Sequence, residues 1–234
     1  MNLWDDPRVI KGMTAQLAER CRRIAAGEQP LGWKLGFGAP AAMTKLKIPG
    51  PISGYLMQSA LLPSGAPVNV KDWIQPVAEP EIAVRLGADV PPGADTATAR
   101  AAIASLTPAI EIADLDLAAS DDNVDVVLAR NIFQRHVVLA EQSRSGADTT
   151  GLSSHVFRRG KLAGETDTPE ALTGRLPDLL VHLANLLHAF GENLTAGTLI
   201  ICGSTLPPPL IEPDETEFTH RIDPIGEVSV RFVR

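Results

Sequence analysis

The sequence predicts an α+β protein in which a mixed, largely antiparallel β core is flanked by a few helices. Short segments rich in branched aliphatic residues alternate with segments rich in Gly, Pro and Ala, a pattern typical of strands joined by turns. Helical periodicity occurs in only a few separated segments, and the strand–helix–strand repeat of a parallel sheet does not recur. No internal repeat and no long linker divides the 234 residues.

The composition limits the partners that the protein can have. With 44% hydrophobic and 21% charged residues, it is typical of a globular protein with a sizeable core. A formal net charge of -7 argues against a nucleic-acid or anionic membrane partner. The start of the chain lacks the pattern of a secretion signal, no apolar stretch is long enough to span a bilayer, and the two cysteines form no metal or disulfide motif. We therefore expect a cytoplasmic protein.

Three segments carry helical signals. In residues 7–26, apolar residues recur at spacings of three and four, and a glycine follows. Residues 96–106 are rich in alanine. The strongest pattern is a stripe of leucines in residues 178–190, preceded by Pro177 and followed by Gly191. We expect a helix in each segment.

Strand character recurs along the rest of the chain. We expect strands at residues 30–38, 52–56, 66–70, 81–86, 108–113, 131–140, 198–205 and 227–233. Residues 88–95 and 143–151 have the composition of loops. Pro80 donates no backbone hydrogen bond, so we expect it at a sheet edge or at a bulge, a feature that can re-aim side chains beside an active site.

Two glutamates stand two residues apart beside this proline. In an extended chain Glu79 and Glu81 share a face, with carboxylates roughly 6–7 Å apart. At an effective dielectric constant near 20, two such charges repel by about 2–3 kcal/mol, which a folded chain tolerates only with a compensating cation. Glu111 lies between two isoleucines of another predicted strand and faces opposite to both, so it could complete a cluster of three carboxylates.

Two interpretations of these glutamates stay open. Three hard oxygen ligands without a histidine or cysteine suit Mg²⁺ or Mn²⁺ rather than zinc. The alternative is a solvated strand edge, with Glu111 as a lone surface charge.

Lys34 also has two interpretations. It stands between Trp33 and Leu35, in a segment with several glycines. Its side chain either extends along the surface toward water or lines a site where the glycines allow close approach of the backbone to a ligand. The Gly-x-Gly spacing is not a phosphate-binding loop, because no helix beginning with Lys-Ser or Lys-Thr follows.

Five segments occur in a characteristic order. They are Gly-Trp-Lys-Leu-Gly at 32–36, Pro-Val-Ala-Glu-Pro-Glu-Ile-Ala at 76–83, Pro-Ala-Ile-Glu-Ile-Ala-Asp at 108–114, the region 183–204, and Gly-Glu-Val-Ser-Val-Arg-Phe at 226–232. Together they resemble the fumarylacetoacetate hydrolase superfamily, and within it the 2-keto-4-pentenoate hydratase and oxalocrotonate decarboxylase branch. The resemblance implies a fumarylacetoacetase-like β-roll as catalytic domain at residues 30–234, after an N-terminal helical segment at 1–29.

The resemblance also implies roles for individual residues. The metal ligands that it implies, for Mg²⁺ or Mn²⁺, are Glu79, Glu81 and Glu111. The substrate-binding positions that it implies are Gly36, Asn131, Gly203 and Ser204. Lys34 corresponds to a lysine that lies beside the substrate in the family, which makes it the first candidate for the catalytic acid or base. His136 is the second candidate, although a single histidine on a β-branched strand can equally be structural.

The chain departs from the hydratase pattern near these positions. Residues 130–133 read Arg-Asn-Ile-Phe where hydratases usually carry Asp-Asn-Ala-Ser, and residues 114–116 read Asp-Leu-Asp in place of Asp-Ser-Arg. A later Gly-Asp turn is replaced at residues 213–215. We expect such a pocket to take a different substrate or to turn over none.

The implied chemistry leaves three functions open. A divalent ion chelated by a 2-oxo or 2-enol carboxylate stabilises the enolate that forms next. We expect a metal-dependent lyase of the hydratase type that acts on a short 2-hydroxydienoate. The alternatives are an acylpyruvate-type C–C hydrolase, in which His136 would activate water, and a non-catalytic protein that binds 2-oxo acids. Family members are dimeric or larger, and we expect a symmetric homodimer.

Overall fold

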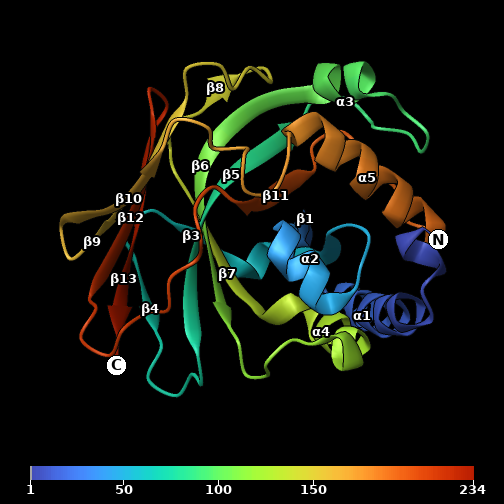
Figure 1. The fold of residues 1–234 in the computed structure, drawn as a ribbon, viewed down its shortest axis with the longest axis horizontal. Coiled ribbons are helices and arrows are strands. Elements are labelled where there is room, and N and C mark those ends of the chain that lie inside the picture. The colour runs from blue at the N-terminus through green and yellow to red at the C-terminus, as the bar shows by residue number, and fades with distance from the viewer. Residues whose placement is uncertain (1) are drawn as a thin grey trace.

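The structure is a computed structural model that describes residues 2–234. Its centre is a strongly curled sheet with the strand order β2-β1-β11-β5-β6-β7-β3, in which β8 also pairs with β6. A second sheet has the order β10-β9-β12-β13-β4. Figure 1 shows the second sheet on one side of the curled sheet and the helices on the other. Most strand pairs are antiparallel, and β1–β11, β13–β4 and β3–β7 are parallel. The predicted α+β class is confirmed.

The strands of the curled sheet are β1 (Pro30–Gly36), β2 (Ile52–Met57), β3 (Leu61–Pro63), β5 (Pro76–Leu86), β6 (Ile103–Asp114), β7 (Gln134–Leu139), β8 (Arg144–Ser145) and β11 (Leu199–Ser204). Those of the second sheet are β4 (Ala66–Asn69), β9 (Ser153–Arg158), β10 (Lys161–Thr166), β12 (Glu217–Asp223) and β13 (Gly226–Val233). The helices are α1 (Pro7–Ala25), α2 (Pro40–Leu46), α3 (Thr96–Ala102), α4 (Val124–Ala129) and α5 (Leu176–Ala189).

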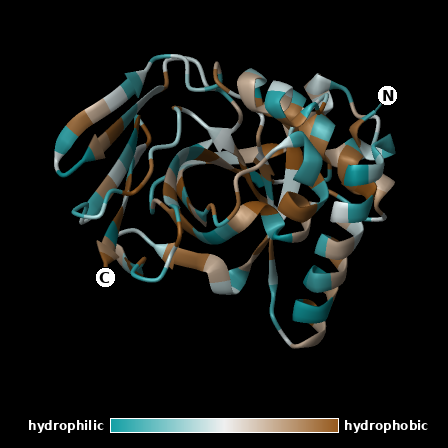
Figure 2. Cartoon of the chain, turned by 60° about the horizontal axis from the view of Figure 1, so that its bottom comes forward, coloured by the Kyte–Doolittle hydropathy of each residue, from teal (hydrophilic) through white to brown (hydrophobic). Residues whose placement is uncertain are grey.

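Local signals account for the two long helices. Asp6 caps α1 by accepting a hydrogen bond of 2.9 Å from the backbone N–H of Arg8, and Pro7 occupies the first helical position. The leucine stripe of α5 is buried against the curled sheet. Figure 2 shows hydrophobic residues concentrated on the inner strands, whereas α1 carries both hydrophobic and hydrophilic residues. Among the described residues, no helix is long and apolar enough to cross a bilayer.

Several predicted boundaries are wrong. The helix predicted at 96–106 ends at residue 102, because Ile103 and Leu106 pair with Leu86 and Val84 of β5. The strand predicted at 131–140 begins only at residue 134. Helix α2 and strands β9, β10 and β12 were not predicted, since their sequences carry weak periodicity and their formation depends on neighbouring elements.

Pro80 is not at a sheet edge. Strand β5 lies between β11 and β6, and Pro80 is opposite Ile110 of β6. On the other side, the register of β11 shifts between Ile201 and Ser204, next to the proline. A bulge is therefore present, as one of the two predicted alternatives requires, but on the partner strand. The missing N–H of Pro80 falls where the ladder is already interrupted.

The curled sheet encloses a small apolar core. Its inward side chains are Leu56, Ala83, Ala109, Val137, Leu199 and Ile201. Other clusters fill the space beneath α5, between α1 and α4, and between the two sheets. The antiparallel pair β5 and β6 crosses the middle of the curled sheet, so side chains on its inner face are shielded from solvent.

Candidate metal centre and active site

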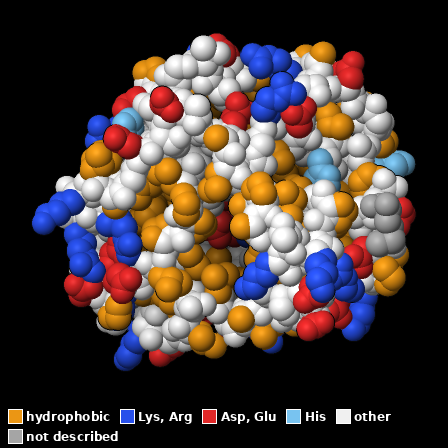
Figure 3. All heavy atoms as spheres, in the orientation of Figure 1, with side chains coloured by type: hydrophobic (Ala, Val, Ile, Leu, Met, Phe, Trp, Pro, Cys, Tyr) orange, Lys and Arg blue, Asp and Glu red, His pale blue; other side chains and the backbone are white. Residues whose placement is uncertain are grey.

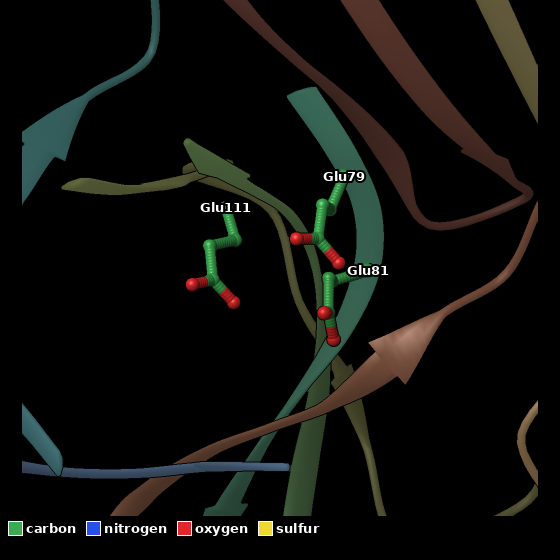
Figure 4. A group of neighbouring side chains, drawn as sticks. All are labelled: Glu79, Glu81 and Glu111. Carbon is green, nitrogen blue, oxygen red and sulfur yellow. The ribbon is translucent and has the colours of Figure 1, made fainter. Parts of the chain in front are cut away.

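The three predicted glutamates meet on the inner face of β5 and β6. Glu79 is directly opposite Glu111 in the antiparallel ladder, and Glu81 is two residues further along β5. One carboxylate oxygen of each residue lies within 4.8 Å of the others. Figure 4 shows the three carboxylates pointing into one space from two neighbouring strands. The predicted cluster is confirmed, and the solvated-edge interpretation is wrong, because Glu81 and Glu111 are both 0% exposed.

Burial and mutual repulsion disfavour the charged forms of these carboxylates. Burial raises the pKa of Glu111 to about 7, against the opposing effect of Lys34. Burial also raises the pKa of Glu81 well above its usual range, and the charges of Glu111 and Glu79 raise it further. The cluster therefore needs positive charge or protons to persist inside the fold.

One backbone N–H group and one hydroxyl group orient the two glutamates of β5. The N–H of Gly203 donates to Oε2 of Glu81 at 2.6 Å, and the hydroxyl of Ser204 donates to Oε2 of Glu79 at 3.0 Å. Gly203 has a φ of 100°, a conformation that glycine adopts easily. The resemblance implied that these two residues bind substrate. In the structure both line the cavity described below, and both bind the carboxylates.

Lys34 supplies the cation that partly balances the cluster. It is only 2% exposed, its Nζ forms an ion pair with Glu111, and it donates to the carbonyl of Ile132 at 3.3 Å. The surface interpretation of Lys34 is therefore wrong. A Cβ atom at Gly54, opposite Lys34 on β2, would lie 3.0 Å from Cγ of Lys34, so this glycine makes room for the buried stem. Nothing local in the sequence links Gly54 to the lysine, so its part in the site was not predicted.

The carboxylate oxygens of the cluster that lack a hydrogen-bond partner fit a hard divalent cation. Oε1 of Glu81 and Oε2 of Glu111 are buried without a hydrogen-bond partner. Three carboxylates face a single ammonium group, and no histidine or cysteine belongs to the cluster. Unpaired buried carboxylate oxygens are costly unless a cation binds them, and an all-oxygen donor set suits Mg²⁺ or Mn²⁺.

A turn between α4 and β7 closes the site beside Lys34. Asn131, Ile132 and Phe133 have consecutive left-handed φ angles of 53°, 50° and 60°. For Ile132 and Phe133 such angles cost on the order of 1 kcal/mol or more each. The side chain of Asn131 holds the turn by accepting from the N–H of Tyr55 at 2.8 Å and donating to its carbonyl at 2.9 Å. Asn131 does not line the cavity, and its amide fixes the turn; its implied contact with substrate stays a prediction.

His136 is not brought to the site. Val137 is the β7 residue opposite Glu111, and His136 is opposite Ile112, on the other face of the sheet. The imidazole stacks on Trp73 with ring centroids 6.2 Å apart. Burial lowers its pKa. The structural interpretation of His136 is therefore the one that the geometry supports.

A cavity of about 300 Å³ opens above the centre. Its polar end is lined by Lys34, Glu79, Gly203 and Ser204, together with Gly36, whose implied position at the substrate site is compatible with this lining. Its walls are largely apolar and include Phe37, Ala42, Leu115, Phe133, Leu172 and Leu210. Figure 3 shows hydrophobic side chains gathered around a hollow with acidic atoms at its floor. The wall residues come from five separate parts of the chain, which is why their sequence carries no common signal.

A curled β-roll with a buried centre of three carboxylates and a lysine defines an enzyme that uses a divalent metal ion. Residues 33–233 match the fumarylacetoacetate (FAA) hydrolase C-terminal family, and the chain belongs to this family. This confirms the resemblance found in the sequence.

Relatives with assigned activities are similar over most of their length. The 4-oxalocrotonate decarboxylase of Pseudomonas putida is 28% identical over 94% of this chain and 84% of its own. The 2-hydroxyhexa-2,4-dienoate hydratase of Comamonas testosteroni is 30% identical over 90% of this chain and 81% of its own. The structure of 4-oxalocrotonate decarboxylase from Pseudomonas putida G7 with magnesium and adipate has a TM-score of 0.82, with 28% identity, and covers 93% of this chain and 83% of that protein.

A more distant neighbour shares the fold. Fumarylpyruvate hydrolase from Pseudomonas aeruginosa, in complex with Mn²⁺ and pyruvate, has a TM-score of 0.67 at 13% identity and covers 88% of this chain and 90% of its own.

Proposed function

We propose that the protein is a metal-dependent lyase of the 2-keto-4-pentenoate hydratase type that acts on 2-hydroxydienoates and their 2-oxo forms. The observation that carries this proposal is the buried cluster of Glu79, Glu81 and Glu111, with two unpartnered oxygens and Lys34, at the end of an apolar cavity. The names of the related hydratases and decarboxylases support the same substrate class.

The chain's own residues have distinct roles in this proposal. The three glutamates would hold Mg²⁺ or Mn²⁺. Such an ion, when bound, polarises the carbonyl of a 2-oxo acid and offsets the negative charge that develops beside it. Gly203 and Ser204 keep Glu81 and Glu79 oriented. The apolar walls limit the access of water to the polar end, which strengthens the electrostatic interactions there.

In this proposal Lys34 holds and moves a proton. Its Nζ is fixed by Glu111 and the Ile132 carbonyl, and it lines the polar end of the cavity. A positioned acid or base of this kind contributes about 10²–10⁴-fold to the rate of a proton transfer. Hydration or decarboxylation of a dienoate needs a proton delivered to carbon, which one such group can supply.

The C–C hydrolase alternative has less support. It requires a group that activates water for attack on a second carbonyl, and His136 faces the other side of the sheet. Among the described residues that line the cavity there is no histidine. A non-catalytic protein that only binds 2-oxo acids would not require a fixed, buried lysine such as Lys34.

The test is a spectroscopic assay followed by product analysis. Purified protein with Mg²⁺ or Mn²⁺ should remove the ultraviolet absorption of 2-hydroxypenta-2,4-dienoate and form a hydrated 2-oxo acid. Loss of the band of an acylpyruvate with release of pyruvate would instead identify a hydrolase. If neither compound changes although the protein binds them, the protein is a binding member of the family.

The proposal extends to the assembly and to the division of the chain. We assign residues 30–234 to the catalytic domain and residues 1–29 to a helical segment packed on it, with α1 against α4. We also propose a symmetric homodimer in the cytoplasm. Light scattering at micromolar concentration tests the dimer, and a monomeric mass would contradict it.

A further inference from the structure

We infer that the substrate carries an apolar alkyl or aryl group at the end remote from its carboxylate, and that the cavity rejects acids ending in a second carboxylate. This inference rests on the proposed function and adds the chemistry of the substrate's far end. Its basis is the contrast between the two ends of the cavity.

The charged groups of the cavity are confined to one end. Among the described residues that line it, Lys34 is the only cation and Glu79 the only anion. Lys34 is already paired with Glu111 and fixed at the carbonyl of Ile132. A 2-oxo acid whose head lies at this polar end must direct its other end along the apolar walls toward the opening (Figure 3).

The turn that carries Ile132 and Phe133 makes part of this wall rigid. Both side chains line the cavity and are only 3% and 4% exposed. The two hydrogen bonds of Asn131 to the backbone of Tyr55 hold their strained, left-handed backbone in place. A wall held in this way cannot easily turn a polar atom toward a ligand.

Two arginines lie behind Phe133, and a third, Arg158, donates to the carbonyl of the wall residue Leu210 and is paired with Glu215. Arg130 and Arg135 line a separate depression that shares Phe133 with the cavity. Each is held by an aspartate: Arg130 by Asp116 at 2.7 Å and Arg135 by Asp114 at 3.4 Å. A second carboxylate in the cavity would therefore lose water without gaining a cation, which is unfavourable.

The volume of the cavity also indicates that the substrate carries a substituent at its far end. A water molecule occupies about 30 Å³ in the liquid, and bonded atoms pack more closely, so an eight-atom, five-carbon 2-oxo acid fills less than about 240 Å³. The cavity measures about 300 Å³. The space that is left adjoins apolar walls, and each methylene placed there should tighten binding by about fourfold.

Binding of unreactive analogues tests the inference without turnover. Isothermal titration calorimetry at pH 7.5 with saturating Mg²⁺ would compare pyruvate, 2-oxohexanoate, 2-oxoadipate and 2-oxo-4-phenylbutanoate. We expect 2-oxohexanoate and 2-oxo-4-phenylbutanoate to bind at least tenfold more tightly than 2-oxoadipate, which has the same chain length as 2-oxohexanoate. Equal or tighter binding of 2-oxoadipate would overturn the inference and leave the proposed function intact. No Mg²⁺-dependent binding of any of the four would overturn the proposed function as well.

A charge placed in the wall gives a second, independent readout. Leu172 is half-buried in a surface loop that lines the cavity, so Leu172→Arg can be accommodated there. We expect this variant to shift the ratio of 2-oxoadipate to 2-oxohexanoate affinity at least tenfold toward the dicarboxylate. Leu162→Arg is the matched control, because Leu162 is 51% exposed on β10 and does not line the cavity. An unchanged ratio in a Leu172→Arg protein that still binds Mg²⁺ and pyruvate would show that the substrate's far end does not follow this wall.

Discussion

Arg130 and Asp116 form an ion pair in which Nη1 and Oδ1 are 2.7 Å apart. These are two of the positions at which the sequence departs from the hydratase pattern, which has an aspartate at the first and an arginine at the second. The charges at the two positions are exchanged relative to that pattern, and here the two side chains attract each other. Both departures therefore fall on one ion pair, and the turn that follows Arg130 contacts Lys34 through the carbonyl of Ile132.

Exchanging the charges of Arg130 and Asp116 together should restore the stability that either single exchange removes. Arg130→Asp and Asp116→Arg each create a like-charge pair, and we expect each to lower the free energy of unfolding by about 1 kcal/mol. The double variant should lie within about 0.5 kcal/mol of the wild type. Urea unfolding measures all four proteins. Additive losses in the double variant would mean that the two side chains do not interact in solution.

Glu81→Gln tests the metal centre directly. The amide keeps an acceptor for the Gly203 N–H and cannot ionise at this buried position, so the metal-free fold should not lose stability. We expect Mg²⁺ or Mn²⁺ to raise the Tm of the wild type but not of this variant. Glu165→Gln, at an exposed position on β10, is the control that should respond like the wild type. A metal-dependent rise in the Tm of Glu81→Gln would exclude Glu81 as a ligand.

The raised pKa values make stability depend on pH and on metal. Folded Glu111 keeps its proton up to about pH 7, whereas in the unfolded chain it loses it near 4.5. The folded state thus binds more protons in this window, so this group's contribution to stability is full below pH 4.5 and is lost as the pH rises through 7. Glu81 acts in the same direction.

A bound metal ion replaces these protons, so the stabilisation that the metal gives should increase with pH. We expect saturating Mg²⁺ to raise the Tm more at pH 8 than at pH 5.5, because at the lower pH protons compete for the same oxygens. Thermal unfolding at both pH values, with Mg²⁺ or with a chelator, measures the difference. An equal rise at the two pH values would mean that the cluster binds metal without releasing protons.

Lys34→Met should separate chemistry from metal binding. Methionine fills the buried space of the lysine stem but holds no proton, so we expect turnover of a 2-hydroxydienoate to fall by about 10²–10⁴-fold. Metal binding should persist, since the three carboxylates remain. Lys34→Arg should not rescue activity, because a guanidinium does not release its proton near neutral pH. Full activity of either variant under saturating Mn²⁺ would remove Lys34 from the mechanism.

The sequence by itself determined which glutamates form the cluster. The period of two along a strand puts Glu79 and Glu81 on one face, and the same rule turns Glu111 away from its isoleucine neighbours. The periodicity of α1 and α5, their prolines and the Asp6 cap are equally local, and both helices were predicted to within a few residues. Such features need no knowledge of the rest of the fold.

Only the tertiary structure decided how these parts meet. Lys34 is buried because β1 pairs with β2 and β11 in the same curled sheet that holds Glu111, a register that no local pattern encodes. The register of β7 against β6 turned His136 to the other face, where a shift of one residue would have exchanged it with Val137. The apolar walls come from loops and helices distant in sequence, and their common environment exists only after long-range strand pairing has closed the sheet around them.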